Sequence, residues 1–138
     1  MYERILVAVD HSEVTERLLG AAKELASLSK GEVWVLHLME REVIPRMGLV
    51  PTESDAEVHA QVESAVVALT QAGVVAHGEV RDTIFGHAAR EIVEDAKKHD
   101  AGVILMGTRG RSDLAGLVLG STAHKVIHLT DRPVLVVR

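Results

Sequence analysis

Glycines, hydroxyls and basic side chains gather in residues 107–122, the part of the sequence best suited to bind phosphate. Three glycines there, which let a backbone approach a ligand closely and adopt positive φ, are Gly107, Gly110 and Gly120. Ser121 and Thr122 follow at the expected start of a helix, where free N–H groups and the positive end of the helix dipole attract anions. Arg109 and Arg111 add positive charge. These groups fit a diphosphate or triphosphate, although a glycine-rich loop alone is equally compatible with a tight connection.

Two standard phosphate-binding motifs do not fit this stretch. A P-loop places Lys directly after its last glycine, whereas Gly120 is followed by Ser121 and the nearest lysine is Lys125. The dinucleotide-binding fingerprint requires glycines in the turn after the first strand, and residues 9–12 contain none. The sequence therefore disfavours a P-loop ATPase and an NAD-dependent dehydrogenase.

Asp10 is the acidic residue with the strongest functional claim. It directly follows an apolar run, residues 5–9, at the carboxyl end of an expected strand, where a carboxylate suits a metal-bound phosphate. The alternative is a structural role as the N-cap of the next helix, with Glu13 completing a capping box. The two roles are compatible, and both stay open. Asp82, after a later strand, is a weaker candidate.

The eight histidines of the sequence raise the question of a metal site. His124 and His128 lie four residues apart and therefore share one helix face. A zinc site requires a third ligand and a supporting shell, so we interpret these two as a surface or interface pair. His37 is expected in the core or at the edge of a pocket, and His87 in solvent.

Five short apolar runs alternate with helix-like stretches. The expected strands are residues 5–9, 33–39, 74–80, 103–106 and 133–137, and the later helices are residues 55–72, 86–98 and 121–129. The first helix should be capped by Asp10 or Ser12 and closed by Gly31. This alternation predicts an α/β fold with a doubly wound, five-stranded parallel sheet, helices on both faces and a single domain spanning residues 1–138. Ligands of such sheets bind beyond the carboxyl ends of the strands, where Asp10 and the glycine-rich stretch would meet.

Two segments are expected to lie at the margins of this sheet. Residues 40–55 lose periodicity and contain Pro45, Gly48 and Pro51, which predicts a mobile loop or lid that a bound nucleotide orders. Residues 74–80 alternate and are partly polar, a pattern typical of a sheet edge.

Composition argues against several classes of partner. The net charge is −5, and the chain has one Phe, one Tyr and one Trp, so it lacks the basic stripe and stacking aromatics of nucleic-acid binders. No apolar run approaches the ~20 residues that cross a bilayer, and the first residues lack a signal-peptide pattern. With no cysteine, disulfides and thiolate metal sites are excluded. We expect a cytoplasmic protein without nucleic-acid or membrane partners.

Three separated motifs resemble the universal stress protein family. One is Gly107-x-x-Gly110, nine residues and Gly120-Ser121, followed by residues 131–137; the others are residues 4–12 and Val35-Leu36-His37-Leu38. The resemblance spans essentially the whole chain. It implies five parallel strands in the order 3-2-1-4-5, a homodimer and, in the subset that keeps this glycine signature, ATP binding.

The resemblance also implies roles for particular residues. Asp10 would lie near the ribose and phosphates and would contact them through Mg²⁺ or Mn²⁺. The backbone at Ala8 and Val9 would border the adenine, and Leu38 would hold the adenine through main-chain hydrogen bonds. The nucleotide-binding set carried over is Ala8, Val9, Asp10, Leu38, Met106, Gly107, Arg109, Gly110, Gly120, Ser121 and Thr122. The sequence departs from the family in placing His11 where Gly or Phe is common and in its two loop arginines.

The function that follows is an ATP-binding regulator of the stress response with little or slow ATP hydrolysis. A homodimer would form through residues 133–137. An uninterrupted apolar strand at a sheet edge can pair with other chains, and pairing of two copies through this strand would cover it. Two alternatives stay open. One is a nucleotide hydrolase or phosphoryl-transfer enzyme on the same fold, and the other is a dimerisation module whose glycine-rich loop binds no nucleotide.

Overall fold

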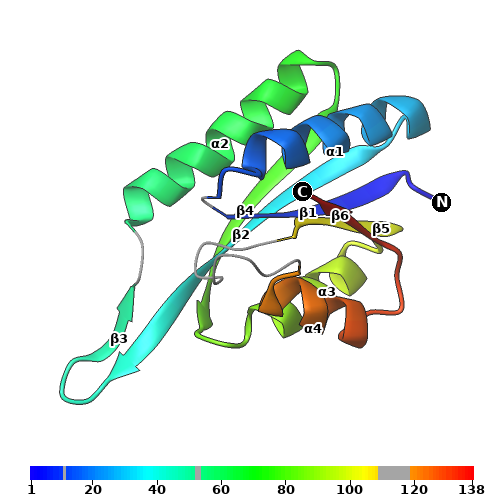
Figure 1. Ribbon diagram of the computed structural model, residues 1–138. Helices are drawn as coiled ribbons and strands as arrows, with labels where there is room; N and C mark the ends of the chain where they lie inside the picture. Colours follow the sequence, from blue (N-terminus) through cyan, green and yellow to red (C-terminus); the bar gives the residue numbers. More distant parts are fainter. Residues whose placement is uncertain (11, 52–53, 109–118) are drawn as a thin grey trace.

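The computed structural model describes residues 1–10, 12–51, 54–108 and 119–138, and its elements form a twisted sheet between two helical layers (Figure 1). The strands are β1 Arg4–Val9, β2 Glu32–Ile44, β3 Gly48–Pro51, β4 Val75–Ile84, β5 Val103–Gly107 and β6 Val134–Val137. The helices are α1 Thr15–Ser29, α2 Asp55–Gln71, α3 Ala88–Lys98 and α4 Ser121–Leu129.

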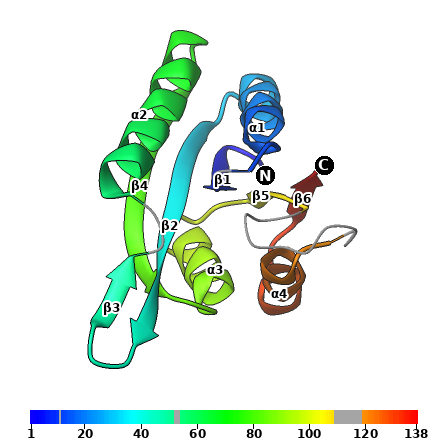
Figure 2. The same ribbon diagram turned by 60° about the vertical axis from the view of Figure 1, so that its left-hand side comes forward.

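The five parallel strands have the predicted order. Across the sheet they run β4-β2-β1-β5-β6, and β3 adds an antiparallel sixth strand to β2 among the described residues. The first two crossovers move toward β4 and the last two move toward β6. Because crossovers between parallel strands are right-handed, α1 and α2 cover one face while α3 and α4 cover the other (Figure 2). The doubly wound α/β fold is therefore confirmed, with one strand more than the sequence indicated.

The core has two halves that share the central strands. On β1, Ile5 and Val7 pack toward α1 and α2, whereas Leu6 packs toward α3 and α4, and all three are fully buried. An uninterrupted apolar run is what a strand covered on both sides requires. The apolar sequence of β1 thus fixes its place in the middle of the sheet.

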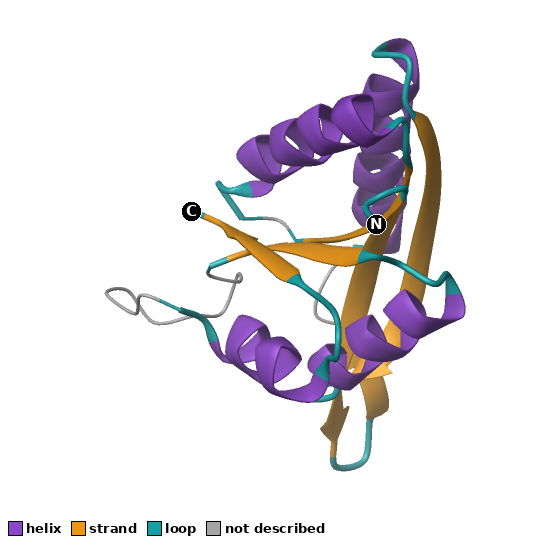
Figure 3. Cartoon of the chain, turned by 90° about the vertical axis from the view of Figure 1, so that its right-hand side faces the viewer, coloured by secondary structure: helices purple, strands orange, loops and turns teal. Residues whose placement is uncertain are grey.

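Most of the segment predicted as a mobile loop or lid, residues 40–55, forms a β-hairpin, so the prediction of an irregular loop is wrong. Its mobility and its ordering by a nucleotide stay predictions. β2 continues to Ile44 and turns back into β3, with Arg41 opposite Pro51 and Ile44 opposite Gly48. The turn contains two residues with positive φ, Arg46 and Gly48. Backbone pairing needs no apolar side chains. β4 runs beside β2 as far as Arg41, so β4 ends at Ile84 and not near residue 80 as the sequence predicted. The loss of periodicity, with Pro45, Gly48 and Pro51 in this stretch, concealed a strand that its neighbour stabilises. Figure 3 shows the hairpin extending beyond the helices.

The ends of α1 differ from the predicted caps. The helix begins at Thr15, its N-cap position is Val14, and no side chain of a described residue caps it, so neither Asp10 nor Ser12 has that role. At the other end Lys30, not Gly31, adopts the left-handed conformation, with φ of 54°. Gly31 serves a different purpose, because a Cβ there would lie 2.9 Å from the carbonyl oxygens of both Tyr2 and Glu3.

Two glycine substitutions should distinguish the close backbone approach at Gly31 from the flexibility that any glycine brings to a helix. Gly31→Ala should lower the free energy of unfolding by about 1–3 kcal/mol, because the new methyl group collides with backbone that cannot easily retreat. Gly20→Ala, in the middle of α1 with no atom within 4 Å of the added Cβ, should raise it by about 0.5–1 kcal/mol. Urea denaturation followed by Trp34 fluorescence measures both. Equal effects of the two variants would contradict the close approach at Gly31.

Candidate functional site

The carboxyl ends of β1 and β2 meet at one edge of the sheet. Val9 pairs with His37 on β2, so Asp10 follows directly beside Leu38. His37 is buried, as expected for a core or pocket-edge histidine, and Leu38 packs partly against the core on the α3 and α4 side. The register therefore brings together two of the residues that the family resemblance assigned to the nucleotide.

The end of β5 reaches the same edge from the other side of β1. Ala8 pairs with Met106, and Gly107 pairs with Val137 on β6. The next residue, Thr108, donates its backbone N–H to the carbonyl of Val137 over 2.9 Å. Ala8, Met106 and Gly107 are thus neighbours, and the chain leaves the sheet at Thr108.

A direct hydrogen bond attaches the start of α4 to this point. The backbone N–H of Gly120 donates to the carbonyl of Thr108. Gly120 is the N-cap of α4 and makes no side-chain capping bond with described residues, while Ser121 and Thr122 form the first turn. The N–H groups of a first helical turn have no partner within the helix, and no described side chain caps them beside the end of β5. Thr108 is the residue of this arrangement that the sequence analysis missed, and only its place directly after Gly107 pointed to it.

Gly120 does not need glycine for its backbone angles. Its φ is −69° and its ψ is 161°, in the extended region that any residue adopts. It is nevertheless buried where the helix start meets the sheet. Gly107 and Gly120 do not use the capacity of glycine for positive φ, because the positive-φ glycines of the described chain lie elsewhere. The prediction of close backbone approach does not depend on it.

The turn after β1 holds Asp10 by two hydrogen bonds. The backbone N–H of Ser12 donates to Asp10 Oδ1 over 2.9 Å, and Thr15 Oγ1 donates to the Asp10 carbonyl over 2.7 Å. Among the described residues, Oδ2 of this half-buried carboxylate has no hydrogen-bond partner. Asp10 therefore shapes the turn through Oδ1 and its backbone carbonyl.

Part of the predicted site lies outside the described residues. Arg109, Gly110 and Arg111 fall there, as does His11 in the turn after β1. The contribution of the two arginines to phosphate binding therefore stays a prediction.

The sequence model of the universal stress protein family matches residues 1–138, the whole chain. The chain belongs to the universal stress protein family. Universal stress protein YxiE of Bacillus subtilis is 32% identical over 148 residues, with 100% of both chains covered. Universal stress protein MJ0531 of Methanocaldococcus jannaschii is 35% identical over 150 residues, covering 100% of this chain and 83% of that protein. The family resemblance inferred from three motifs is thereby confirmed.

A solved structure of another family member adds a ligand to this comparison. The universal stress protein from Archaeoglobus fulgidus in complex with dAMP superposes with a TM-score of 0.76 at 28% identity, covering 99% of this chain and 98% of that one. Its fold is the doubly wound α/β fold found here. That relative binds an adenine nucleotide.

The remaining candidates of the sequence lie away from the sheet edge. His124 and His128 form an exposed pair on α4 with ring centroids 4.8 Å apart, as predicted, and His87 is exposed at the N-cap of α3. Asp82 lies within β4, not after it, and forms an ion pair with Arg41 at 2.9 Å. None of the helices in the described ranges has the length and apolar character needed to span a bilayer.

The bond from Thr15 should stabilise the Asp10 turn measurably. Thr15→Val removes a partly buried hydroxyl donor while keeping the side-chain shape, and should lower the free energy of unfolding by about 1 kcal/mol. The matched control is Thr70→Val, which removes an exposed hydroxyl bond to Val66 within α2. Chemical denaturation compares the two variants, and a Thr15→Val loss no larger than that of the control would contradict a structural role for this bond.

Proposed function

We propose that this universal stress protein binds ATP at the edge formed by the carboxyl ends of β1, β2 and β5 and the start of α4. The observation that carries the proposal is the N-terminus of α4, which no side chain of the described residues caps and which is attached through Gly120 and Thr108 to the end of β5. Helix N-termini with free N–H groups are suited to phosphate. The Archaeoglobus fulgidus relative in complex with dAMP supports an adenine nucleotide as the ligand class.

Each end of the nucleotide has its own set of residues in this proposal. The backbone of Ala8 and Val9, with Leu38 and Met106, borders the adenine. Asp10 lies toward the ribose and phosphates and would bind Mg²⁺ or Mn²⁺ through Oδ2, the oxygen that Ser12 does not use. The phosphate donors are Gly107, Arg109, Gly110, Gly120, Ser121 and Thr122.

The same proposal makes the protein a regulator and not an efficient enzyme. No lysine follows Gly120 as in a P-loop, and the sequence offers no obvious base to activate water, so hydrolysis should be slow. We further infer one nucleotide-binding domain over residues 1–138, a cytoplasmic location and a homodimer. β6 supports the dimer, because it pairs only with β5 in the described sheet and leaves Leu135 43% exposed.

Asp10→Asn tests the metal-binding half of the site. Asn keeps an oxygen for the Ser12 N–H, so the turn is preserved, but it removes the charge that Mg²⁺ requires. Isothermal titration calorimetry should show that affinity for ATP in Mg²⁺ falls by at least about tenfold, the loss that even an outer-shell partner of a metal ligand causes, whereas adenosine affinity changes little.

The control is Glu24→Gln, which makes the same charge change on the exposed side of α1 and should leave ATP affinity unaltered. Unchanged ATP binding by Asp10→Asn would refute the assigned role. Absence of binding heat with ATP, ADP or AMP in the parent protein would favour the dimerisation module instead. Rapid phosphate release that Asp10→Asn abolishes would favour the enzyme.

Gly120→Val tests the phosphate half. The backbone angles of Gly120 suit valine, but the branched side chain would stand between the first turn of α4 and an incoming phosphate. ATP affinity should fall by at least about tenfold, a loss of ~1.4 kcal/mol, and AMP affinity should fall less because fewer phosphates meet α4. Urea denaturation confirms that the variant is folded, and Gly120→Ala provides a milder step. Normal ATP uptake by folded Gly120→Val would show that the site has been placed wrongly.

A further inference from the structure

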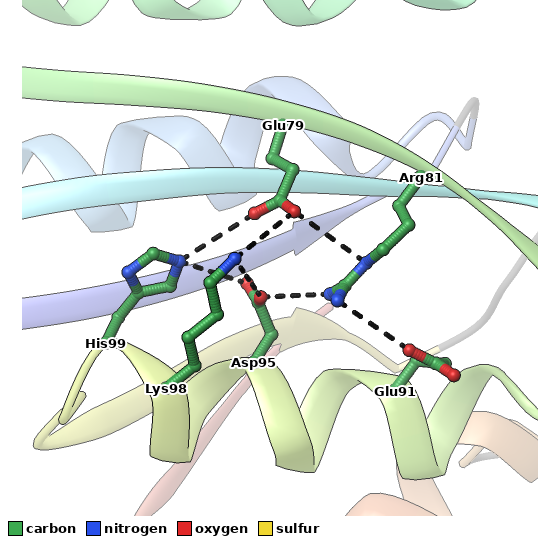
Figure 4. A network of polar contacts seen from close by, with 6 residues as sticks. All are labelled: Glu79, Arg81, Glu91, Asp95, Lys98 and His99. Atoms are coloured by element: carbon green, nitrogen blue, oxygen red, sulfur yellow. Dashed lines mark hydrogen bonds and ion pairs between the residues drawn. The ribbon is translucent and has the colours of Figure 1, made fainter.

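A second group of charged and polar side chains lies between β4 and α3, and it includes none of the residues assigned to the nucleotide. We call it the polar cluster, and Figure 4 shows its six members, Glu79, Arg81, Glu91, Asp95, Lys98 and His99. Glu79 and Arg81 project from the edge strand toward α3, and the others belong to α3 or its C-cap. The polar cluster is only partly exposed to water, so the electrostatic interactions among its side chains are stronger than they would be in water.

Asp95 is the centre of the polar cluster. Its side chain is 0% exposed, and its Oδ1 accepts a hydrogen bond from Arg81 Nη2 at 2.9 Å. Its Oδ2 has no hydrogen-bond partner among the residues that the structure describes. A buried carboxylate oxygen without a partner is costly, and in native proteins it often marks an ion or a water.

The cations of the cluster all lie on one side of the two carboxylates. Arg81 Nε and Lys98 Nζ approach Glu79 Oε1 at 3.8 and 3.6 Å. On Asp95, Arg81 Nη2 and Lys98 Nζ approach Oδ1. The other two oxygens, Glu79 Oε2 and Asp95 Oδ2, each lie 3.7 Å from His99 Nε2. That distance is too long for a hydrogen bond, and His99 Nε2 also lacks a partner in the described part of the chain.

We propose that Glu79 Oε2, Asp95 Oδ2 and His99 Nε2 bind a divalent metal ion of the Zn²⁺ type. The three atoms lie within 4.8 Å of one another. Zn²⁺ bonds of about 2.0–2.2 Å to nitrogen and oxygen place neighbouring ligands of a tetrahedral ion about 3.3–3.6 Å apart, close to the 3.7 Å observed on two sides of the triangle. Glu79 and His99 are partly exposed, so an ion can enter and take water as a fourth ligand.

A proton on His99 would give a partner to fewer of the unpaired carboxylate oxygens than a metal ion would. Nε2 of an imidazolium carries one hydrogen and can serve one carboxylate, whereas an ion placed between the three atoms serves both. The second oxygen of each carboxylate is already balanced by Arg81 or Lys98. An ion among the remaining three atoms would therefore complete the arrangement without displacing Arg81.

The ligand types select the kind of ion. Imidazole suits Zn²⁺ and its transition-metal neighbours, whereas Mg²⁺ prefers oxygen ligands alone and retains its waters. Bound Zn²⁺ would join the C-terminal end of α3 to the edge strand β4. This function is independent of the nucleotide site, which uses none of the three ligands.

The chain carries its own reporter for this site. Trp34, the single tryptophan, stacks on His99 with ring centroids 4.8 Å apart and on His77 with centroids 5.1 Å apart. The His77 side chain contacts Glu32 instead of the cluster. Metal binding at His99 should therefore change Trp34 fluorescence, and His77 provides a matched control.

The test is titration of the full chain with Zn²⁺, followed by Trp34 fluorescence and calorimetry. The parent protein should bind one equivalent saturably, with no matching response to Mg²⁺. His99→Phe keeps a ring against Trp34 but removes the ligand nitrogen, and Glu79→Gln removes a partly exposed carboxylate. Each should weaken Zn²⁺ binding by at least about tenfold, the loss that even an outer-shell partner causes. His77→Phe should bind like the parent.

Three results would overturn the site. One is a parent protein with no saturable Zn²⁺ binding. The second is undiminished affinity in both His99→Phe and Glu79→Gln. The third is loss of all binding on replacing the exposed pair, His124 and His128, with phenylalanine. If His99→Phe fails to fold by circular dichroism, Glu79→Gln alone decides the question.

Discussion

Burial of β1 on both faces is the constraint on which the rest of the structure depends. Ile5 and Val7 pack toward α1 and α2, while Leu6 packs toward α3 and α4. A strand that is apolar on both sides requires a helical layer above and below. The parallel strands that flank β1 must then be connected by right-handed crossovers, and their carboxyl ends meet at one edge.

That edge collects the polar groups that the core excludes. The carboxylate of Asp10, the backbone of Thr108 and the first turn of α4 all lie there because the strands end in register. None of them forms part of an apolar layer, and the Thr108 backbone uses its N–H and its carbonyl to join β6 and the start of α4 at this edge. The core thus determines where the candidate site lies, and the residues at the strand ends supply its polar groups.

The edge strand β4 follows a different rule. Its Gly78 faces α2, where an added Cβ would meet Val62 and Val66. Its opposite face carries Glu79 and Arg81 toward α3. An edge strand is paired on one side only, so water reaches its margin and polar side chains can be accommodated beneath a helix. The polar cluster exists because β4 does not need the continuous apolar run of β1.

The sequence by itself determined the α/β class, the order of the apolar elements and the family, because apolar periodicity and glycine spacing are local patterns. It also indicated Asp10 and Gly120, which stand at recognisable element boundaries. The hairpin of β2 and β3, the true start of α1 and the burial of Asp95 were decided only by tertiary structure. Strand pairing, close approach and burial depend on segments distant in the chain. Arg81 and Asp95 lie on different elements, and no local pattern records that they meet.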